Sequence, residues 1–192
     1  HNSTVDATTD GKGAVADMTL EQIKKLDAGS KFRKSFAGTE VPTLKEVFAF
    51  MKGKINAYVD FKAGSPEKFA AILKEYDMVE HSVVYSSLEQ AAQLTKINSA
   101  IKVMPGIDET KLLAPLQKQY DLKAVETNIA SLTKEYVEEA HRLGMVVFCD
   151  VLGFTDSKQS IKKAAGLGVD VIQTDNADIA IKYIKNMNMK KN

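Results

Sequence analysis

The stretch between residues 57 and 172 alternates short apolar runs with segments of helical periodicity, and this alternation constrains the fold more than any other feature. The apolar runs are rich in Val, Ile, Tyr and Phe, which strands favour. Each run precedes a segment whose apolar residues recur every three or four positions, as in an amphipathic helix. The runs lie at Ala57–Phe61, Ser82–Tyr85, Ile101–Met104, Lys123–Val125, Met145–Cys149 and Val169–Ile172. Successive strand–helix units predict a parallel sheet covered by helices.

Two architectures fit such a series of units, an open doubly wound sheet and a (β/α)8 barrel. A barrel contains eight units and typically about 250 residues. The chain has 192 residues, and six units are visible. Two further helices are expected ahead of the first strand, near Leu20–Leu26 and Leu44–Met51. Thr19 and Gln22 form a capping-box pattern before the first of these, and Pro42-Thr43 starts the second.

The bulk composition excludes several classes of protein. The net charge is +1, from 26 basic and 25 acidic residues, which argues against a nucleic-acid surface built on overall charge. The single cysteine, Cys149, excludes an internal disulfide and a cysteine-rich zinc site. The sequence has no apolar run of about 18 residues and therefore no transmembrane segment. It indicates neither an oligomeric state nor a compartment, whether cytoplasmic, periplasmic or secreted.

The segment Asn56-Ala-Tyr-Val-Asp-Phe-Lys62 is the sharpest candidate for a site. Strand side chains alternate, so Asp60 and Lys62 share one face, and the apolar residues between them share the other. The face with Asp60 and Lys62 would point into a barrel near its carboxyl end, where barrel enzymes place their catalytic groups. Charged groups there are costly to bury unless they are paired or functional. Spacing alone leaves two interpretations open, a functional pair and a structural ion pair.

Other polar residues fall into two groups. One group follows the later strands and could line a pocket; it consists of Ser86, Glu126, Asp150 and Asp175. The other group is expected to be structural. His81 opens a strand, His141 lies among charged residues of a helix, and Cys149 lies inside an apolar strand as a small core residue.

Several segments together resemble the glycerophosphodiester phosphodiesterase family. The opening HNSTVDATTDGKG resembles the family's second-histidine loop, with Asn2 in place of the usual Asp and Ala7 in place of an Arg. The strand ending D-x-K at Asp60 and Lys62 resembles the family's E-x-K. Three scaffold segments also match, at residues 17–27, 41–47 and 168–175, although Ala177 replaces a usual Pro. The resemblance therefore extends over nearly the whole chain.

The resemblance implies a fold, a reaction and a set of site residues. The fold would be a TIM-type (β/α)8 barrel whose first two strands are missing from this chain, in a single incomplete domain over residues 1–192. The reaction would be the metal-dependent hydrolysis of small glycerophosphodiesters to glycerol 3-phosphate and an alcohol. Asp60 would bind a divalent metal, Mg²⁺ or Ca²⁺, because its oxygen suits hard cations. Lys62 would contact the substrate phosphate, and His1 would be a catalytic histidine that transfers protons.

In the family, an H-R histidine and an E-x-D metal pair precede the segment with which this sequence starts. We therefore expect the 192-residue chain alone to be nearly inactive. Two alternatives stay open. One is a non-catalytic barrel that binds a phosphorylated ligand at a degenerate site, as the changes at Asn2 and Asp60 would allow. The other is a different phosphate-handling barrel enzyme, such as an isomerase or an aldolase, although a Schiff-base lysine is disfavoured by the nearby Asp60.

Overall fold

The computed structural model describes residues 2–189, except for the side chains of residues 186–189. The chain divides into two compact units. One contains the residues up to Asn56 together with Ile72–Met78; the other contains Ala57–Ala71 together with the residues from Val79 onward. Within the described part of the chain, no helix is both long enough and apolar enough to span a membrane.

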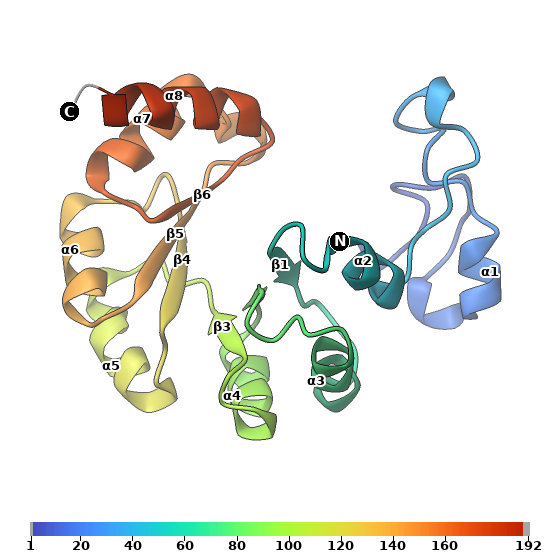
Figure 1. Ribbon diagram of the computed structural model, residues 1–192, viewed down its shortest axis with the longest axis horizontal. Coiled ribbons are helices and arrows are strands. Elements are labelled where there is room, and N and C mark those ends of the chain that lie inside the picture. Colours follow the sequence, from blue (N-terminus) through green and yellow to red (C-terminus); the bar gives the residue numbers. More distant parts are fainter. Residues whose placement is uncertain (1, 190–192) are drawn as a thin grey trace. The chain divides into compact units, whose positions relative to one another are not determined.

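The first unit holds short helices joined by turns (Figure 1). Its elements are the 3-10 helices η1 (Val15–Asp17) and η2 (Lys34–Phe36) and the α-helices α1 (Leu20–Lys24) and α2 (Leu44–Met51). The expected capping box at Thr19 is confirmed, and Thr43 forms a second one with Glu46. Helix α2 has the expected bounds. Helix α1 ends two residues before the expected Leu26, because the chain soon turns to pair Asp27 with Glu40 in an antiparallel bridge.

The second unit contains the predicted alternation of strands and helices (Figure 1). The strands are β1 (Ala57–Asp60), β2 (Ser82–Tyr85), β3 (Lys102–Met104), β4 (Ala124–Asn128), β5 (Val146–Asp150) and β6 (Val171–Gln173). The helices that follow them are α3 (Pro66–Glu75), α4 (Leu88–Ile97), α5 (Thr110–Tyr120), α6 (Lys134–Arg142), α7 (Lys158–Leu167) and α8 (Ala177–Met189), with η3 (Gly153–Thr155) before α7. The end of α3, from Ile72 onward, belongs to the first unit.

All strand pairings in this unit are parallel, in two sheets ordered β1-β2-β3 and β4-β5-β6. A single parallel bridge between Gly106 and Glu126 connects β4 with the chain just after β3. Strand β4 continues three residues beyond the expected Val125, because its polar end still pairs with β5 up to Asn128 and Asp150. The described residues thus form the predicted parallel α/β fold as two three-stranded sheets, without a closed barrel.

The strands curve strongly toward one another on their inner face. In a flat sheet β1 and β4 would lie roughly 14 Å apart, three strand spacings. Instead the Tyr58 hydroxyl on β1 donates a 3.0 Å hydrogen bond to Glu126 on β4. The rings of Tyr58 and Phe148, which lies on β5, have centroids only 6.3 Å apart. This curvature is typical of a barrel wall and disfavours the open doubly wound alternative.

The helices cover the outer face of the strands. Alternate residues such as Val84, Val125 and Val147 are fully buried there, together with helix residues such as Leu94 and Ile161. Inner-face residues form a smaller cluster of Met104, Ala124 and Phe148, against which Tyr58, Val83 and Tyr85 pack. The apolar contacts of both faces fix the strands, and the polar strand ends are left to form a site.

We predict that Tyr136→Phe lowers the free energy of unfolding by about 1–3 kcal/mol. The Tyr136 ring is fully buried in α6, and its hydroxyl donates a 2.7 Å hydrogen bond to the Ile107 carbonyl. Removing the hydroxyl leaves that buried carbonyl without its donor. Urea unfolding followed by circular dichroism measures the change. The control Tyr120→Phe, at a half-buried residue of α5, should change stability by less than about 0.5 kcal/mol; an equal loss in both variants would contradict the interpretation.

Candidate functional site

A polar cavity of about 260 Å³ lies at the carboxyl ends of the central strands, on the inner face of the second unit. Ligand sites of parallel α/β folds form at this end of the strands. Beneath the polar walls lie the apolar side chains of Met104, Ala124 and Phe148. The residues that line the cavity are Tyr85, Gly106, Asp108, Glu126, Thr127, Asn128 and Asp150.

The Asp60 and Lys62 side chains lie beside this cavity and form a 2.9 Å ion pair. They therefore lie on one side of the chain, as strand alternation predicts. The Lys62 ammonium is also 5.2 Å from the ring centroid of Tyr85, which forms one wall of the cavity. Both side chains are partly exposed, at 34% for Asp60 and 46% for Lys62, so a ligand can reach them.

Glu126 is the most buried charged residue of the cavity, with 7% of its surface exposed. The pKa of its carboxyl is raised from 4.5 to about 7, mainly by burial and also by the carboxylates of Asp150 and Asp60, whereas the Tyr58 hydrogen bond lowers it. The Lys62 ammonium acts in the opposite direction. Burial, followed by the charge of Glu126, also raises the pKa values of Tyr58 and Tyr85 above the ordinary value for tyrosine. Both tyrosines are therefore neutral hydrogen-bond donors near neutral pH.

Hydrogen bonds hold the polar rim of the cavity in place. The Asp108 Oδ1 atom accepts from the Thr127 hydroxyl and from the Asn128 side-chain amide, each at 2.9 Å. These bonds join the segment after β3 to the end of β4. Asp150 accepts from the backbone N–H of Leu152 at 2.6 Å, which fixes the chain as it leaves β5. The rim is thus preorganised by side chains of the site itself.

Gly106 makes room for the tyrosine wall. A Cβ atom at this position would lie 2.9 Å from the Tyr85 hydroxyl oxygen, closer than real Cβ contacts allow. The backbone at Gly106 also bridges to Glu126 of β4. A larger residue here would displace either the tyrosine or the joint between the two sheets.

The structure brings together some of the residues indicated by the sequence. Glu126 and Asp150 line the cavity, whereas Ser86 and Asp175 are not among the residues that line it. Ser86 is buried, and its hydroxyl has no hydrogen-bond partner among the described residues. His1 lies outside the described residues. Asp108 was not indicated by the sequence pattern, because it lies in an irregular segment beyond β3.

Of the three residues expected to be structural, His141 and Cys149 lie as expected, and His81 directly precedes β2. His141 on α6 makes a 2.9 Å contact with Asp170 at the surface. The backbone carbonyl of His81 accepts from the N–H of Ala57, at the start of the β1–β2 pairing. Cys149 is fully buried, and burial raises the pKa of its thiol to about 12, so it is a poor nucleophile.

The donor chemistry around Asp60 suits a hard cation. The carboxylates of Asp60 and Asp150 lie close enough to Glu126 to add to the rise of its pKa that burial causes. Oxygen ligands of this kind are those that Mg²⁺ and Ca²⁺ prefer. Within residues 2–189, however, no three His, Cys, Asp or Glu side chains are grouped closely enough to hold a metal ion by themselves. Asp60 is thus one fitting ligand, paired at present with Lys62.

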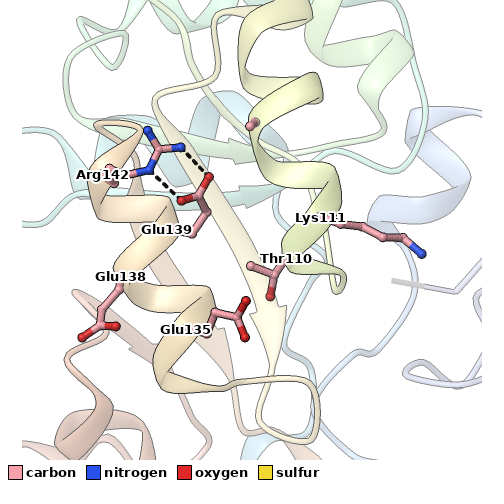
Figure 2. Close-up of a pocket in the computed structure, with 7 residues that line it drawn as sticks. Thr110, Lys111, Glu135, Glu138, Glu139 and Arg142 are labelled. Atoms are coloured by element: carbon pink, nitrogen blue, oxygen red, sulfur yellow. Dashed lines mark hydrogen bonds and ion pairs between the residues drawn. The ribbon is translucent and has the colours of Figure 1, made fainter.

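A larger hollow of about 460 Å³ lies between α5 and α6, in the helix layer (Figure 2). Its labelled side chains include Thr110, Lys111 and three glutamates, of which Glu139 is paired with Arg142 at 2.6 Å (Figure 2). Exposed charges that pair with one another are typical of a solvated helix surface. The inner-face cavity, with its buried carboxyl and fixed rim, is therefore the candidate site.

Comparison with known proteins places the chain in a family. Residues 1–179 match the model of the "Glycerophosphoryl diester phosphodiesterase family". The chain belongs to this family. A glycerophosphodiester phosphodiesterase from Caldanaerobacter subterraneus subsp. tengcongensis is 32% identical, over 96% of this chain and 79% of that protein. The "Putative glycerophosphodiester phosphodiesterase YhdW" of Bacillus subtilis is 26% identical over 98% of this chain and 81% of its own length.

Solved structures of phosphodiesterases share the fold. A glycerophosphodiester phosphodiesterase from Agrobacterium tumefaciens superposes with a TM-score of 0.83 and 26% identity, covering 94% of this chain and 78% of that one. An Oleispira antarctica phosphodiesterase, solved with the product sn-glycerol-3-phosphate, superposes with a TM-score of 0.81 at 17% identity, covering 95% and 78%. The resemblance recognised from the DATTDGKG, D-x-K and scaffold segments is thereby confirmed at the level of the phosphodiesterase family.

We predict that the stability of this phosphodiesterase family member falls as the pH rises from about 4.5 to 7, through ionisation of Glu126. The pKa of Glu126 is higher in the folded state than in the unfolded state. The protonated carboxyl therefore contributes its full stabilisation below the unfolded-state pKa, and this contribution is lost as the pH rises through the folded-state pKa. Urea unfolding at a series of pH values should show this loss in the parent protein. The loss should be much smaller in Glu126→Gln, whose side chain cannot ionise.

Glu138→Gln is the matched control, because Glu138 lies on the exposed face of α6 and pairs with Lys134. This variant should keep the pH dependence of the parent protein. The assignment to Glu126 would be wrong if Glu126→Gln retained the full loss of stability between the two pH values.

Proposed function

We propose that the inner-face site hydrolyses glycerophosphodiesters to glycerol 3-phosphate and an alcohol. The observation that carries this proposal is the Asp60–Lys62 pair beside the cavity, in a chain that belongs to the glycerophosphoryl diester phosphodiesterase family. We further propose that both units belong to one phosphodiesterase barrel domain, since the family model spans residues 1–179 and thus includes both.

Lys62 is proposed to bind the phosphate of the substrate. Its ammonium is half-exposed and is held between the Asp60 carboxylate and the face of Tyr85, so its position is defined before a ligand arrives. A lysine ammonium stabilises phosphate oxygens as negative charge builds on them in the transition state. The partial exposure of Lys62 leaves donors available for such an oxygen.

Asp60 is proposed to hold a divalent cation, Mg²⁺ or Ca²⁺, with its carboxylate. When bound, such an ion polarises the phosphate and lowers the barrier to attack by water. In the hydrolysis the bond between phosphorus and the alcohol oxygen breaks, water supplies the new phosphate oxygen, and the leaving alkoxide takes a proton. His1 is proposed to take part in this proton transfer, because imidazole exchanges protons near neutral pH.

A second function, binding of a phosphorylated ligand without turnover, is favoured by one observation. The described residues contain no ready group of three metal-ligating side chains, and Asp60 already pairs with a lysine. A degenerate site of this kind would retain Lys62 and the cavity, and so would bind glycerol 3-phosphate without cleaving a diester. Family membership argues against the other alternative, an isomerase or an aldolase.

The test of function is chelator-sensitive release of glycerol 3-phosphate from glycerophosphocholine or glycerophosphoethanolamine by the natural protein. Asp60→Ala should weaken metal binding, measured by calorimetry, and should lower the rate. Lys62→Ala should leave metal binding intact and slow turnover about a hundredfold, since loss of one transition-state charge contact costs on the order of 3 kcal/mol. Lys111→Ala, which removes a surface lysine paired with Glu109, is the control and should leave both unchanged.

Each outcome decides between the alternatives. Metal binding and turnover equal to those of the parent protein after Asp60→Ala would contradict the proposal that Asp60 binds the metal. An unchanged rate after Lys62→Ala would contradict the proposed contact between Lys62 and the phosphate. Binding of glycerol 3-phosphate without hydrolysis of either diester, in the presence of both metals, would establish the non-catalytic function instead.

A further inference from the structure

The loop at residues 28–39 of the first unit exposes two phenylalanine rings, and we refer to it as the basic aromatic loop. Phe32 is 78% exposed and Phe36 is 48% exposed. Their ring centroids are 5.8 Å apart, so the two side chains form one apolar patch. Soluble proteins rarely leave adjacent large apolar side chains in water unless the surface binds something.

Three cations flank these rings, and no acidic residue lies between positions 28 and 39. The cations are Lys31, Arg33 and Lys34, all exposed. The Arg33 guanidinium lies 6.0 Å from the centroid of the Phe32 ring. The basic aromatic loop thus combines a small apolar patch with a concentration of positive charge, in a chain whose net charge is only +1.

The carboxylates at the two ends of the loop have partners other than its three cations. Asp27 accepts from the backbone N–H groups of Gly29 and Ser30, at 2.8 and 3.1 Å. The Ser30 hydroxyl and these N–H groups hold the pKa of Asp27 well below its usual range. Glu40 forms a 3.1 Å ion pair with Lys24. Among the described residues, neither acid pairs with Arg33 or Lys34, whereas Lys31 lies near the Asp6 carboxylate and helps to lower its pKa.

The loop is also held in a defined shape. Its ends pair in an antiparallel bridge between Asp27 and Glu40, and the N–H of Ala28 donates to the Thr39 carbonyl at 2.8 Å. Gly29 packs directly on the Phe36 carbonyl, where a Cβ atom would lie 1.8 Å from the oxygen. Helix η2 orders the residues up to Phe36. A fixed loop loses little conformational entropy when it binds a surface.

We propose that the basic aromatic loop docks the protein on an anionic lipid surface. Aromatic rings favour the boundary between headgroups and acyl chains, and lysine and arginine favour the phosphates just above it. The loop offers both groups on one short segment. A soluble polyanion would pair with the cations but would leave the two rings in water. The proposal does not depend on the hydrolytic activity of the inner-face site.

The test is cosedimentation of the purified protein with lipid vesicles. One set contains phosphatidylcholine alone, and the other contains phosphatidylcholine mixed with phosphatidylserine. We expect binding to the mixed vesicles and little binding to the neutral ones. Binding should weaken as salt is added, because salt screens the attraction between the loop and the charged headgroups.

Two loop variants separate the two contributions. Replacing Arg33 and Lys34 together with Gln should weaken binding about fivefold for each charge removed. Replacing Phe32 and Phe36 together with Ser should weaken it by at least about tenfold, because two rings can no longer insert. Lys31 is kept, since its ammonium contacts the Asp6 carbonyl and anchors the loop.

Phe154→Ser is the matched control. Phe154 is fully exposed in η3, and the charged residue nearest to it in the sequence is the acidic Asp156. This variant should bind mixed vesicles as the parent protein does. Circular dichroism checks that each variant is folded, and the Arg33/Lys34 variant, which changes only surface charges, decides the outcome if the phenylalanine variant unfolds.

Three results would overturn the proposal: no binding to mixed vesicles, equal binding to neutral vesicles, or parent-like binding by the folded loop variants. A loss of binding in Phe154→Ser as large as in the loop variants would equally contradict it, because the effect would then not belong to the loop.

Discussion

The hydrogen bond from Tyr58 to Glu126 is the contact on which the arrangement of the inner face depends. It connects strands that are three positions apart, so it exists only because the parallel strands curve toward one another. The same curvature brings the Asp60–Lys62 pair, at the carboxyl end of β1, beside a cavity built mainly by β2, β4 and β5. A flat sheet with the same sequence would spread these groups along its edge and would form no common site.

Curvature also produces the electrostatic character of the site. Burial, with the approach of Asp60 and Asp150, holds the pKa of Glu126 near 7, whereas Lys62 counteracts the accumulated negative charge. The site has one cation, Lys62, among several carboxylates. The carboxylates would stabilise an added divalent ion, and the Lys62 ammonium would bind a phosphate. The proposed roles of Asp60 and Lys62 follow from this balance as well as from membership of the phosphodiesterase family.

The sequence predicted the regular parts of the fold, because they depend on local periodicity and capping. Helix α2 and strand β2 have their expected bounds, and all six expected strands are present. It did not predict the polar extension of β4, since Glu126, Thr127 and Asn128 interrupt the apolar pattern although they continue the pairing. Alternation predicted that Asp60 and Lys62 lie on one side of the chain, which their ion pair confirms, and their roles at the site stay predictions. Asp108 was not, because its place in the site depends on hydrogen bonds between segments that are distant in sequence.

The most direct test of this account is to map glycerol 3-phosphate binding by NMR chemical-shift perturbation. The account predicts that the largest changes occur at Lys62, Tyr85 and Glu126, which share the inner-face site. Residues of the hollow between α5 and α6, such as Glu135 and Arg142, act as an internal reference and should not shift. Changes concentrated in that hollow, or no changes at the inner face at saturating ligand, would contradict the account.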